Sequence, residues 1–351
     1  MEPTPASLGF SMPAEWERHD ATWISWPKDP NTFPPSLLPK VEEAYVKMVE
    51  ALGAAEEVRI LVDDKKTEAR AAAMLKHGED VSFHRIRTVD VWTRDYLPTY
   101  VRKEEVALVK WDFNAWGRKY DDLLPDDGAG TRVAESTGLR IFRPGVVLEG
   151  GSIDSDGEGT VLTTEQCLLN PNRNPGLTRG DVEGVLRDCL GAKTVVWLGR
   201  GIEGDDTDGH VDDIARFVGP RTVAAAVEAK ESDPNKAALS ENLSALKGAR
   251  TARGKAIEVV EIPMPPRVES EYGRLPASHL NFYVGNRSVV VPTFGGRSDR
   301  TALKALEGAF PRREVVGIDC RALVYGLGTL HCVTQQAPSA RLSPSPVRRG
   351  L

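Results

Sequence analysis

The sequence lacks the features that would place a protein in a membrane, on nucleic acid or outside the cell. Its 351 residues include no apolar run near the roughly 20 residues that a membrane-spanning helix needs. A formal net charge of -6 leaves no basic excess for binding phosphates. The N-terminal residues carry neither the basic segment nor the apolar run of a secretion signal. We therefore expect a cytoplasmic protein with neither a membrane span nor a nucleic-acid partner.

Cysteine is scarce as well. The four cysteines are at positions 167, 189, 320 and 332, and no two of them form a CxxC pair. This spacing argues against a disulfide framework and against a structural zinc site built on thiolates. Three of the four are expected to be ordinary buried thiols in a reducing compartment.

The sequence does contain a repeated pattern of secondary-structure signals. Five stretches read as a strand, a turn, a second strand, a loop, a helix and a closing strand. The clearest stretch has strands over 146–153 and 160–169, a helix over 179–190 and a strand over 194–198. The second stretch is helix-poor, with strands over 91–101 and 106–111 before an acidic, turn-rich segment over 114–130.

The other three stretches follow the same order of elements. Their expected strands and helices are 21–26, 38–55 and 58–62; 211–218, 222–227, 237–246 and 256–262; and 280–284, 288–292, 299–309 and 314–318. Five copies favour a radially repeated α/β assembly over an open doubly wound sheet. Residues 1–337 are expected to form one domain. The Pro-, Ser- and Arg-rich tail over 338–351 is expected to be disordered.

Cys332 is the first candidate for chemistry. It follows two glycines, Gly326 and Gly328, which allow the backbone to approach another group closely. A thiol is a strong nucleophile only as thiolate, so it needs a cationic or proton-accepting neighbour. His331 is adjacent, but consecutive side chains of an extended segment point to opposite faces. The sequence leaves open whether Cys332 is catalytic or a small buried hydrophobe.

A second candidate segment, residues 204–213, combines several acids with one histidine. If a strand begins at His210, the side chains of His210 and Asp212 face the same side. We favour a catalytic role for this pair. A metal site that uses the His-x-Asp spacing, a calcium-like loop and a plain acidic turn are the alternatives.

Three further residues belong to the candidate set. Glu149 ends an apolar run, and a buried carboxylate is costly unless it meets a cation or orders a histidine. Asp95 follows Arg94, and a local surface pair is the plain interpretation. Trp92 is either a core aromatic or a lid over a flat cationic group.

Taken together, these segments resemble the agmatine deiminase family, within the guanidine-modifying superfamily that includes arginine and peptidylarginine deiminases. The similarity spans nearly the whole chain. The motifs that carry it are Met12-Pro13-Ala14-Glu15-Trp16, Thr22-Trp23, Trp26-Pro27, Trp92-Thr93-Arg94-Asp95, Phe113-Asn114-Ala115-Trp116-Gly117, Leu148-Glu149-Gly150-Gly151-Ser152, Leu168-Leu169-Asn170-Pro171-Asn172-Arg173-Asn174-Pro175, Asp205-Asp206-Thr207-Asp208-Gly209-His210-Val211-Asp212 and His331-Cys332-Val333-Thr334-Gln335-Gln336.

The resemblance implies a five-bladed α/β propeller of pseudo-fivefold symmetry, built from ββαβ-type modules, with neither metal nor organic cofactor. It implies that Cys332 is the nucleophile and His210 the acid and base, with Glu149 orienting His210. Asp95 and Asp212 would hold the planar guanidinium, which two carboxylates can grip through its N–H groups. The implied reaction converts agmatine to N-carbamoylputrescine and ammonia through a covalent amidino-cysteine.

Two departures from the family pattern keep the substrate open. The chain reads Tyr96-Leu97 after Asp95, where many members have Thr-Gly, and Leu327 and Thr329 stand in a run that is commonly Gly-rich. Arginine, peptidylarginine or another guanidine compound is the alternative substrate. An amidinotransferase, a metal-dependent hydrolase using His210, Asp212 and His279, and a non-catalytic binding module are the alternative functions. Homo-oligomerisation stays open.

Overall fold

The computed structural model describes residues 3–75, 80–271 and 273–340, and the strands in this part of the chain form six small sheets. Four three-stranded sheets share one topology, in which the first pair of strands is antiparallel and the second pair is parallel. These sheets are β4 (Thr99–Arg102), β5 (Val106–Val109) and β6 (Arg140–Phe142); β7 (Asp154–Ser155), β8 (Thr160–Thr164) and β9 (Thr194–Leu198); β10 (Ala215–Gly219), β11 (Thr222–Val227) and β12 (Glu258–Pro263); and β15 (Tyr283–Val284), β16 (Ser288–Thr293) and β17 (Glu314–Asp319). The fold is therefore mixed α/β with its strands divided among small sheets.

The fifth sheet joins the two ends of the described chain. Its order is β18 (Gln335–Pro338), β1 (His19–Ser25), β2 (Glu57–Val62) and β3 (Val81–Arg85). β18 is antiparallel to β1, while β1–β2 and β2–β3 are parallel. The first strand of this unit thus comes from the C-terminal end. The sixth sheet is the short pair β13 (Glu269–Ser270) and β14 (Gly273–Arg274).

Two residues that the sequence assigned to the tail lie in the folded part of the chain. Pro338 is the last residue of β18, and the Ser339 backbone N–H donates to the Arg18 carbonyl at 2.8 Å. Residues 338 and 339 therefore belong to the folded part of the chain. The rest of the predicted tail, from 341 onward, lies outside the described residues.

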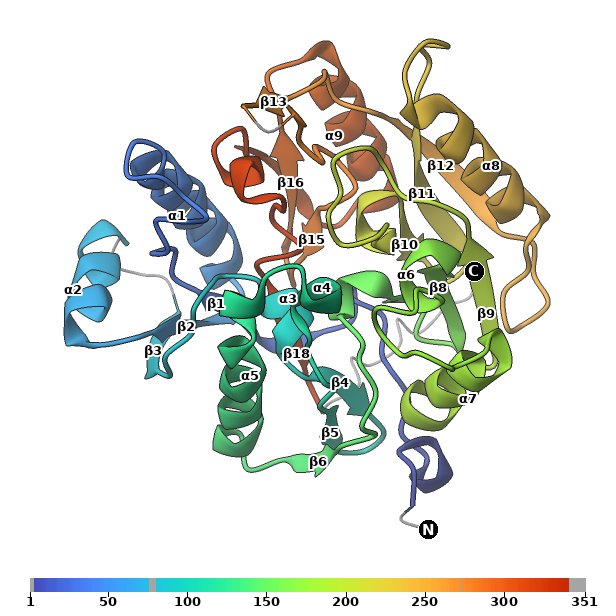
Figure 1. The fold of residues 1–351 in the computed structure, drawn as a ribbon, viewed down its shortest axis with the longest axis horizontal. Helices are drawn as coiled ribbons and strands as arrows, with labels where there is room; N and C mark the ends of the chain where they lie inside the picture. The colour runs from blue at the N-terminus through green and yellow to red at the C-terminus, as the bar shows by residue number, and fades with distance from the viewer. Residues whose placement is uncertain (1–2, 76–79, 272, 341–351) are drawn as a thin grey trace, which may run out of the picture.

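The four three-stranded sheets and the β18-β1-β2-β3 sheet each have a helix between their second strand and the parallel strand that follows it. These helices are α1 (Leu38–Gly53), α5 (Pro125–Ser136), α7 (Arg179–Leu190), α8 (Asn235–Gly248) and α9 (Arg297–Ala309), and they lie on the outer side of the sheets (Figure 1). A further helix, α2 (Lys65–Met74), joins β2 to β3. Thr178 and Asp181 form a capping box at the start of α7, and Gly191 ends the helix with a φ of 70°. These local signals explain why the predicted helix over 179–190 is confirmed.

The prediction of an acidic, turn-rich segment over 114–130 is wrong in its second half, where α5 forms. Pro125 opens this helix, and Asp126 and Asp127 lie in its first turn, which suits the positive end of the helix dipole. Gly130 lies inside this helix, and the position requires glycine because a Cβ there would overlap the Tyr96 carbonyl. Close packing thus required the glycine that made the segment resemble a turn.

Several first strands differ from the prediction, because the segments before them turn away from the sheet. The strand expected over 146–153 is wrong, since the first strand of that sheet is β7, over 154–155, and the only β-structure of 146–153 is an isolated bridge at Val147. The expected strand over 91–101 is the helix α3 (Thr93–Tyr96) followed by β4, and 3-10 turns η3 (Gly150–Ser152) and η4 (Val211–Asp213) precede β7 and β10. The strand over 160–169 likewise ends at Thr164, where α6 (Glu165–Leu168) begins. The premise that His210 and Asp212 share one face of a strand is therefore wrong.

The buried apolar side chains fall into three clusters, which pack between the outer helices and their sheets. The largest cluster surrounds β1, β2 and α1, the second surrounds β11, β16 and α9, and the third lies beneath α7. Among the described residues, no helix combines the length and the apolar character needed to cross a membrane.

Candidate active site

Three of the six candidate residues line one cavity, and the other three lie beside them. Its volume is about 560 Å³, and Trp92, Asp95 and Cys332 are among its lining residues. The lining is strongly acidic, and its other aspartates are Asp29, Asp90, Asp122 and Asp206. Arg274 is the sole cationic side chain among the described lining residues. A cavity of this charge favours a cationic ligand.

Cys332 lies at the base of the cavity with 7% of its surface exposed. Its Sγ is 3.1 Å from Asn281 Nδ2, 3.4 Å from Asn281 Oδ1 and 3.9 Å from Asp212 Oδ2. Gly328 lies opposite, because a Cβ there would be 2.5 Å from the Trp92 ring and 3.1 Å from the Cys332 Cβ. This glycine therefore keeps the space between the indole and the thiol open.

The electrostatic environment of Cys332 differs from what a resting thiolate needs. Burial, followed by the carboxylates of Asp212, Asp213 and Asp95, raises the pKa of the thiol well above its ordinary value. No cationic side chain is among the described groups that shift the pKa of Cys332, so no positive charge offsets the three carboxylates. This environment favours the neutral thiol of Cys332 over its thiolate.

Asn281 is a site residue that the sequence analysis missed. Its Oδ1 accepts hydrogen bonds from the Thr329 hydroxyl at 2.8 Å and from the His331 backbone N–H at 3.1 Å. Its Nδ2 is 3.2 Å from Asp213 Oδ1 as well as close to the Cys332 sulfur. Asn281 precedes the short strand β15 and fixes the turn that carries Cys332. An asparagine in an apolar run was the only signal available.

His210 lies between two carboxylates. Its Nδ1 is 3.9 Å from Asp95 Oδ1 and its Nε2 is 3.7 Å from Glu149 Oε2. Nε2 is buried and has no hydrogen-bond partner among the described residues. Burial by itself would lower the pKa of His210, but Asp95, Cys167 and Glu149 outweigh it and hold the pKa well above its ordinary value. The imidazole is therefore poised to be an imidazolium, which is a proton donor.

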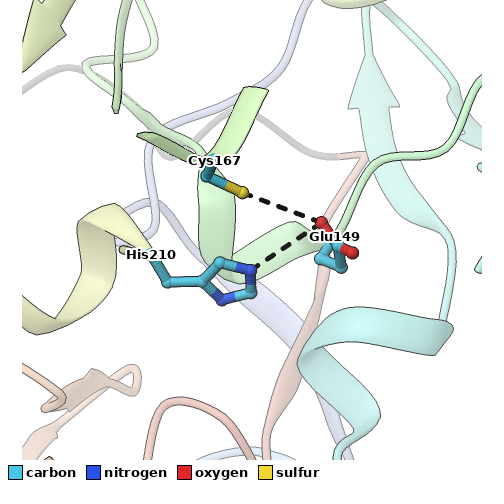
Figure 2. Close-up of side chains that lie close together, drawn as sticks. All are labelled: Glu149, Cys167 and His210. Atoms are coloured by element: carbon cyan, nitrogen blue, oxygen red, sulfur yellow. Dashed lines mark hydrogen bonds and ion pairs between the residues drawn. The ribbon is translucent and has the colours of Figure 1, made fainter. Parts of the chain in front are cut away.

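Glu149 is a buried carboxylate that contacts a cation, Arg173, and a histidine, His210. Both partners offset the cost of burying its charge. Arg173 Nε donates to Glu149 Oε1 at 2.7 Å, and the other oxygen, Oε2, faces His210 and Cys167. Figure 2 shows the Cys167 sulfur and a His210 ring nitrogen directed at the same carboxylate oxygen. Burial opposes ionisation, yet Arg173 and His210 lower the pKa of Glu149. Arg173, which lies in the Asn170–Pro175 stretch, is a second residue that the candidate set omitted.

Asp95 is held at the end of the short helix α3. Its Oδ2 accepts from Trp116 Nε1 at 3.0 Å and its Oδ1 accepts from the Gly151 N–H at 3.0 Å. Burial is the largest influence on its pKa, which is raised to about 6 against the lowering effect of His210. The neighbouring Arg94 is buried and bonds Gln336 Oε1 at 2.7 Å, so a local surface pair with Asp95 is excluded.

Asp212 is held in place by a contact with His331. His331 Nδ1 is 2.6 Å from Asp212 Oδ2, and its Nε2 is 2.8 Å from Glu15 Oε2. Burial would raise the pKa of Asp212, but His331 lowers it. Asp212 Oδ1 is buried without a hydrogen-bond partner among the described residues. The carboxylate thus keeps one oxygen available for a donor.

Two tryptophans line the cavity. Trp92 is 5% exposed and its Nε1 donates to Asp90 Oδ2 at 2.8 Å. Trp116 lies in a strained segment, in which Ala115, Trp116 and Arg118 have φ values of 52°, 54° and 64°. Such a segment persists only where its surroundings fix it, and here the bond to Asp95 does so. Trp116 was quoted in the sequence motifs but was not among the candidates.

Of the residues that depart from the family pattern, only Leu327 lines the cavity. Thr329 bonds Asn281 as described above, while Tyr96 and Leu97 are buried in the core, where the Tyr96 hydroxyl donates to the Asp90 carbonyl at 3.2 Å. Their influence on the cavity is therefore indirect.

His279 is not part of the site. Its Nδ1 is 2.8 Å from the Pro292 carbonyl and its Nε2 is 3.2 Å from Ser298 Oγ. The alternative metal site of His210, Asp212 and His279 is therefore not assembled. Within the described part of the chain, the group whose donor atoms converge is Glu149, Cys167 and His210.

Comparisons with known proteins place this geometry in context. A family model described as Porphyromonas-type peptidyl-arginine deiminase matches residues 11–338. The chain is 37% identical to an agmatine deiminase of Stutzerimonas stutzeri over 366 residues, covering 96% of this chain and 97% of that protein. The structure of an agmatine deiminase of Enterococcus faecalis is similar, with a TM-score of 0.90, 31% identity and coverage of 97% and 99% of the two chains. A cysteine-to-serine variant of a C. jejuni agmatine deiminase with substrate bound has a TM-score of 0.85, 28% identity and coverage of 94% and 96%.

Proposed function

The chain belongs to the Porphyromonas-type peptidyl-arginine deiminase family, and we propose that it hydrolyses agmatine to N-carbamoylputrescine and ammonia. The observation that carries the proposal is an acidic cavity lined by the Cys332 thiol and the Asp95 carboxylate. Asp212 Oδ2 lies 3.9 Å from the Cys332 sulfur, and His210, which faces Glu149, lies 3.9 Å from Asp95. The named activity of relatives that match nearly the whole chain supports the same chemistry.

The acidic lining favours agmatine over arginine. The two substrates differ at the end away from the guanidinium, where agmatine has a single amine and arginine also has a carboxylate. Arg274, the cation of the lining, is already paired with Glu203 at 3.1 Å and with Asp233 at 2.8 Å. A substrate carboxylate would face the aspartates without a free partner, whereas an amine would be stabilised by them.

We assign the binding of the guanidinium to Asp95 and Asp212. The group is planar and presents its N–H bonds in fixed directions, so two carboxylates can set the position of its central carbon. Asp212 Oδ1 lacks another partner, and Asp95 belongs to the cavity wall. Trp92 would cover the flat face of the cation, where an indole ring is attractive.

The first half of the reaction forms a covalent intermediate. Cys332 Sγ attacks the guanidinium carbon while His210 donates a proton to the departing nitrogen, so that ammonia leaves and an amidino-thioether remains. His210 Nδ1, the nitrogen on the Asp95 side, is the atom that we assign to this transfer. Glu149 holds the ring from its Nε2 side.

The second half regenerates the thiol. Water gives one proton to the now neutral His210 and attacks the same carbon. The C–S bond then breaks, the second proton of the water goes to the sulfur, and a urea group remains.

The raised pKa of Cys332 requires that the thiol ionise before it attacks. A guanidinium bound beside the sulfur would offset the surrounding carboxylates, so the thiol releases its proton to solvent after the substrate binds.

We also propose that the five helix-containing sheets are the blades of a single propeller domain, whose predicted extent of 1–337 becomes 1–339. Each of the four three-stranded sheets repeats one order of strands, and β18, β1 and β2 repeat it with strands from the two ends of the chain. The residues Asp95, Glu149, His210, Asn281 and Cys332 each precede the first strand of a different sheet or lie in the turn before it. Because the five residues occupy the same position in five repeated sheets, we expect the sheets to surround one centre where these residues meet.

The test is ammonia release from agmatine, arginine and a blocked arginyl peptide, compared by kcat/KM. Agmatine is expected to be preferred by at least about tenfold, which corresponds to one favourable charge contact. Cys332→Ser should abolish release, and exhaustive chelation should leave it intact. Release that survives Cys332→Ser, or that requires an added amine acceptor, would overturn the proposed hydrolysis.

A further inference from the structure

Cys167 is a buried thiol that the proposed reaction does not use. It lies in α6 with no exposed surface, on the far side of Glu149 from Arg173. Its Sγ is 4.0 Å from Glu149 Oε2, and His210 Nε2 is 3.7 Å from the same oxygen. All three donor atoms lie within 4.8 Å of one another (Figure 2).

We propose that Glu149, Cys167 and His210 form a binding site for a thiophilic divalent cation such as Zn²⁺, and that occupancy of this site inhibits the enzyme. Zinc binds one carboxylate oxygen, one thiolate and one imidazole nitrogen well, and a site with three protein ligands leaves a fourth position for water. The thiol proton of Cys167 and the Nε2 proton of the His210 imidazolium are both released to solvent when the ion binds.

The spacing of the donor atoms suits a tetrahedral ion. With ordinary zinc–ligand distances, the edges of the tetrahedron are about 3.4 Å between nitrogen and oxygen and about 3.6 Å between sulfur and oxygen. The corresponding separations are 3.7 Å and 4.0 Å. These two edges would shorten by only a few tenths of an ångström, and the third, between sulfur and nitrogen, is within 4.8 Å. Side-chain rotation can supply such movements.

A second observation points to a ligand at this place. His210 Nε2 is buried, is directed toward the other two donors and has no hydrogen-bond partner among the described residues. A buried polar atom without a partner is costly, and coordination to a cation would satisfy it. Arg173 opposes a cation here, but its Nε engages the other carboxylate oxygen and leaves Oε2 free. The imidazole separates the site from the cavity, because its Nδ1 faces Asp95 on the cavity wall.

Inhibition follows from two of the ligands having roles in the proposed function, on which this consequence rests. An ion on Nε2 holds His210 as a neutral ring whose remaining proton cannot be gained and lost in the catalytic cycle. It also takes the Glu149 oxygen that faces His210. Metal binding itself does not depend on the reaction, so the two proposals can fail separately.

The experiment is Co²⁺ binding to the full chain without substrate, followed by absorption spectroscopy. A thiolate ligand gives a near-ultraviolet charge-transfer band, and a tetrahedral ion gives intense visible bands. We expect one equivalent of Co²⁺ to give both in the wild type and in Cys332→Ser. Cys167→Ser and Cys167→Ala should lose the charge-transfer band, whereas Cys189→Ser should keep it.

The expected kinetic result is that Zn²⁺ inhibits the wild type at concentrations at least about tenfold below those needed for Cys167→Ser, because one of three ligands is missing. Because Cys167 contacts Glu149 and influences the pKa of His210, the basal kcat/KM of Cys167→Ser can differ from that of the wild type, so each protein's inhibition is measured relative to its own rate without Zn²⁺. A band lost in Cys332→Ser but retained in Cys167→Ser would place the ion on the nucleophile and overturn the proposal, as would the absence of a band in the wild type. A band in a protein that releases no ammonia from agmatine would leave the site standing and refute the function.

Discussion

At the scale of single residues, the site consists of ordinary side chains whose properties are set by their neighbours. Asp95 and Asp212 are chemically identical, yet burial raises the pKa of the first and His331 lowers that of the second. The sequence identified both carboxylates. It could not identify Asn281, because nothing in the local sequence distinguishes this asparagine from one in a turn.

Asn281→Ala is predicted to reduce kcat by about 10²-fold and to change KM by less than about threefold, because the turn that positions the thiol loses its central acceptor. Steady-state kinetics with agmatine measures both values. Asn242→Ala is the matched control, since Asn242 is equally buried but accepts from Gly199 far from the cavity. An equal loss of kcat in the two variants would assign Asn281 a merely structural role.

Alkylation of Cys332 by iodoacetamide is predicted to be slow at pH 7 and to accelerate continuously to at least pH 9. The reason is the raised pKa of the thiol, which leaves little thiolate at neutral pH. Peptide mapping should find the label on Cys332 before Cys167, Cys189 and Cys320, because only Cys332 lines the cavity. Agmatine should protect it. A rate that is independent of pH between 6 and 8 would contradict a neutral resting thiol.

At the scale of secondary structure, most helices and the later strands of each repeat were predicted better than the first strands, while α5 was missed. The helices over 179–190, 237–246 and 299–309 were confirmed within two residues at each end because their apolar pattern and end signals are local. The first strands were predicted too long where residues such as 150–152 and 211–213 turn inward. Those turns depend on partners from distant segments, so a strand-like apolar pattern misled the prediction.

The turn at Gly151 provides an element-scale test. A Cβ at this position would lie 2.6 Å from His210 Nδ1 and 3.0 Å from both Asp212 Oδ2 and Asp95 Oδ1. Gly151→Ala is predicted to reduce kcat/KM by at least about 10²-fold and to lower the free energy of unfolding by about 1–3 kcal/mol, since three catalytic side chains must move. Kinetics and urea denaturation measure the two effects.

Gly248→Ala is the control for that variant. No atom lies within 4 Å of a Cβ placed there, at the end of α8. This substitution should leave kcat/KM unchanged and should not destabilise the fold, because alanine is the better helix former. If Gly151→Ala were as active as Gly248→Ala, the close packing of the three side chains around Gly151 would be refuted.

At the scale of the whole molecule, the fold buries carboxyl groups that hold protons to unusually high pH. Burial raises the pKa of Asp126 to about 7, with a further contribution from Asp90, whose own pKa is raised to about 6. The unfolded chain releases these protons near pH 4. These two carboxyl groups therefore contribute stability at low pH, and this contribution is lost as the pH rises from about 4 through 7.

Asp126→Asn is predicted to reduce the pH dependence of stability between pH 5 and 7. For the wild type, Asp126 contributes a decline of up to about 1.4 kcal/mol per pH unit, which the variant lacks. Urea denaturation at several pH values measures this slope. The absolute stability of the variant also changes, because Asp126 accepts from the Val89 and Asp90 N–H groups, so the slope rather than the value is the readout. Identical slopes in the two proteins would contradict the raised pKa.

The sequence by itself determined the kinds of residue available and most of the elements that carry them. A thiol, a histidine and three carboxylates stand in distinctive local motifs, and helix periodicity and capping act over a few residues, so both can be read along the chain. The tertiary structure alone decided that Asn281 and Trp116 join the site, that β18 pairs with β1, and that burial and nearby carboxylates raise the pKa of Cys332. These properties depend on contacts between segments up to hundreds of residues apart, and on burial, which no local pattern encodes. The same long-range packing places Cys167 beside Glu149 and His210, where a metal ion would find three ligands.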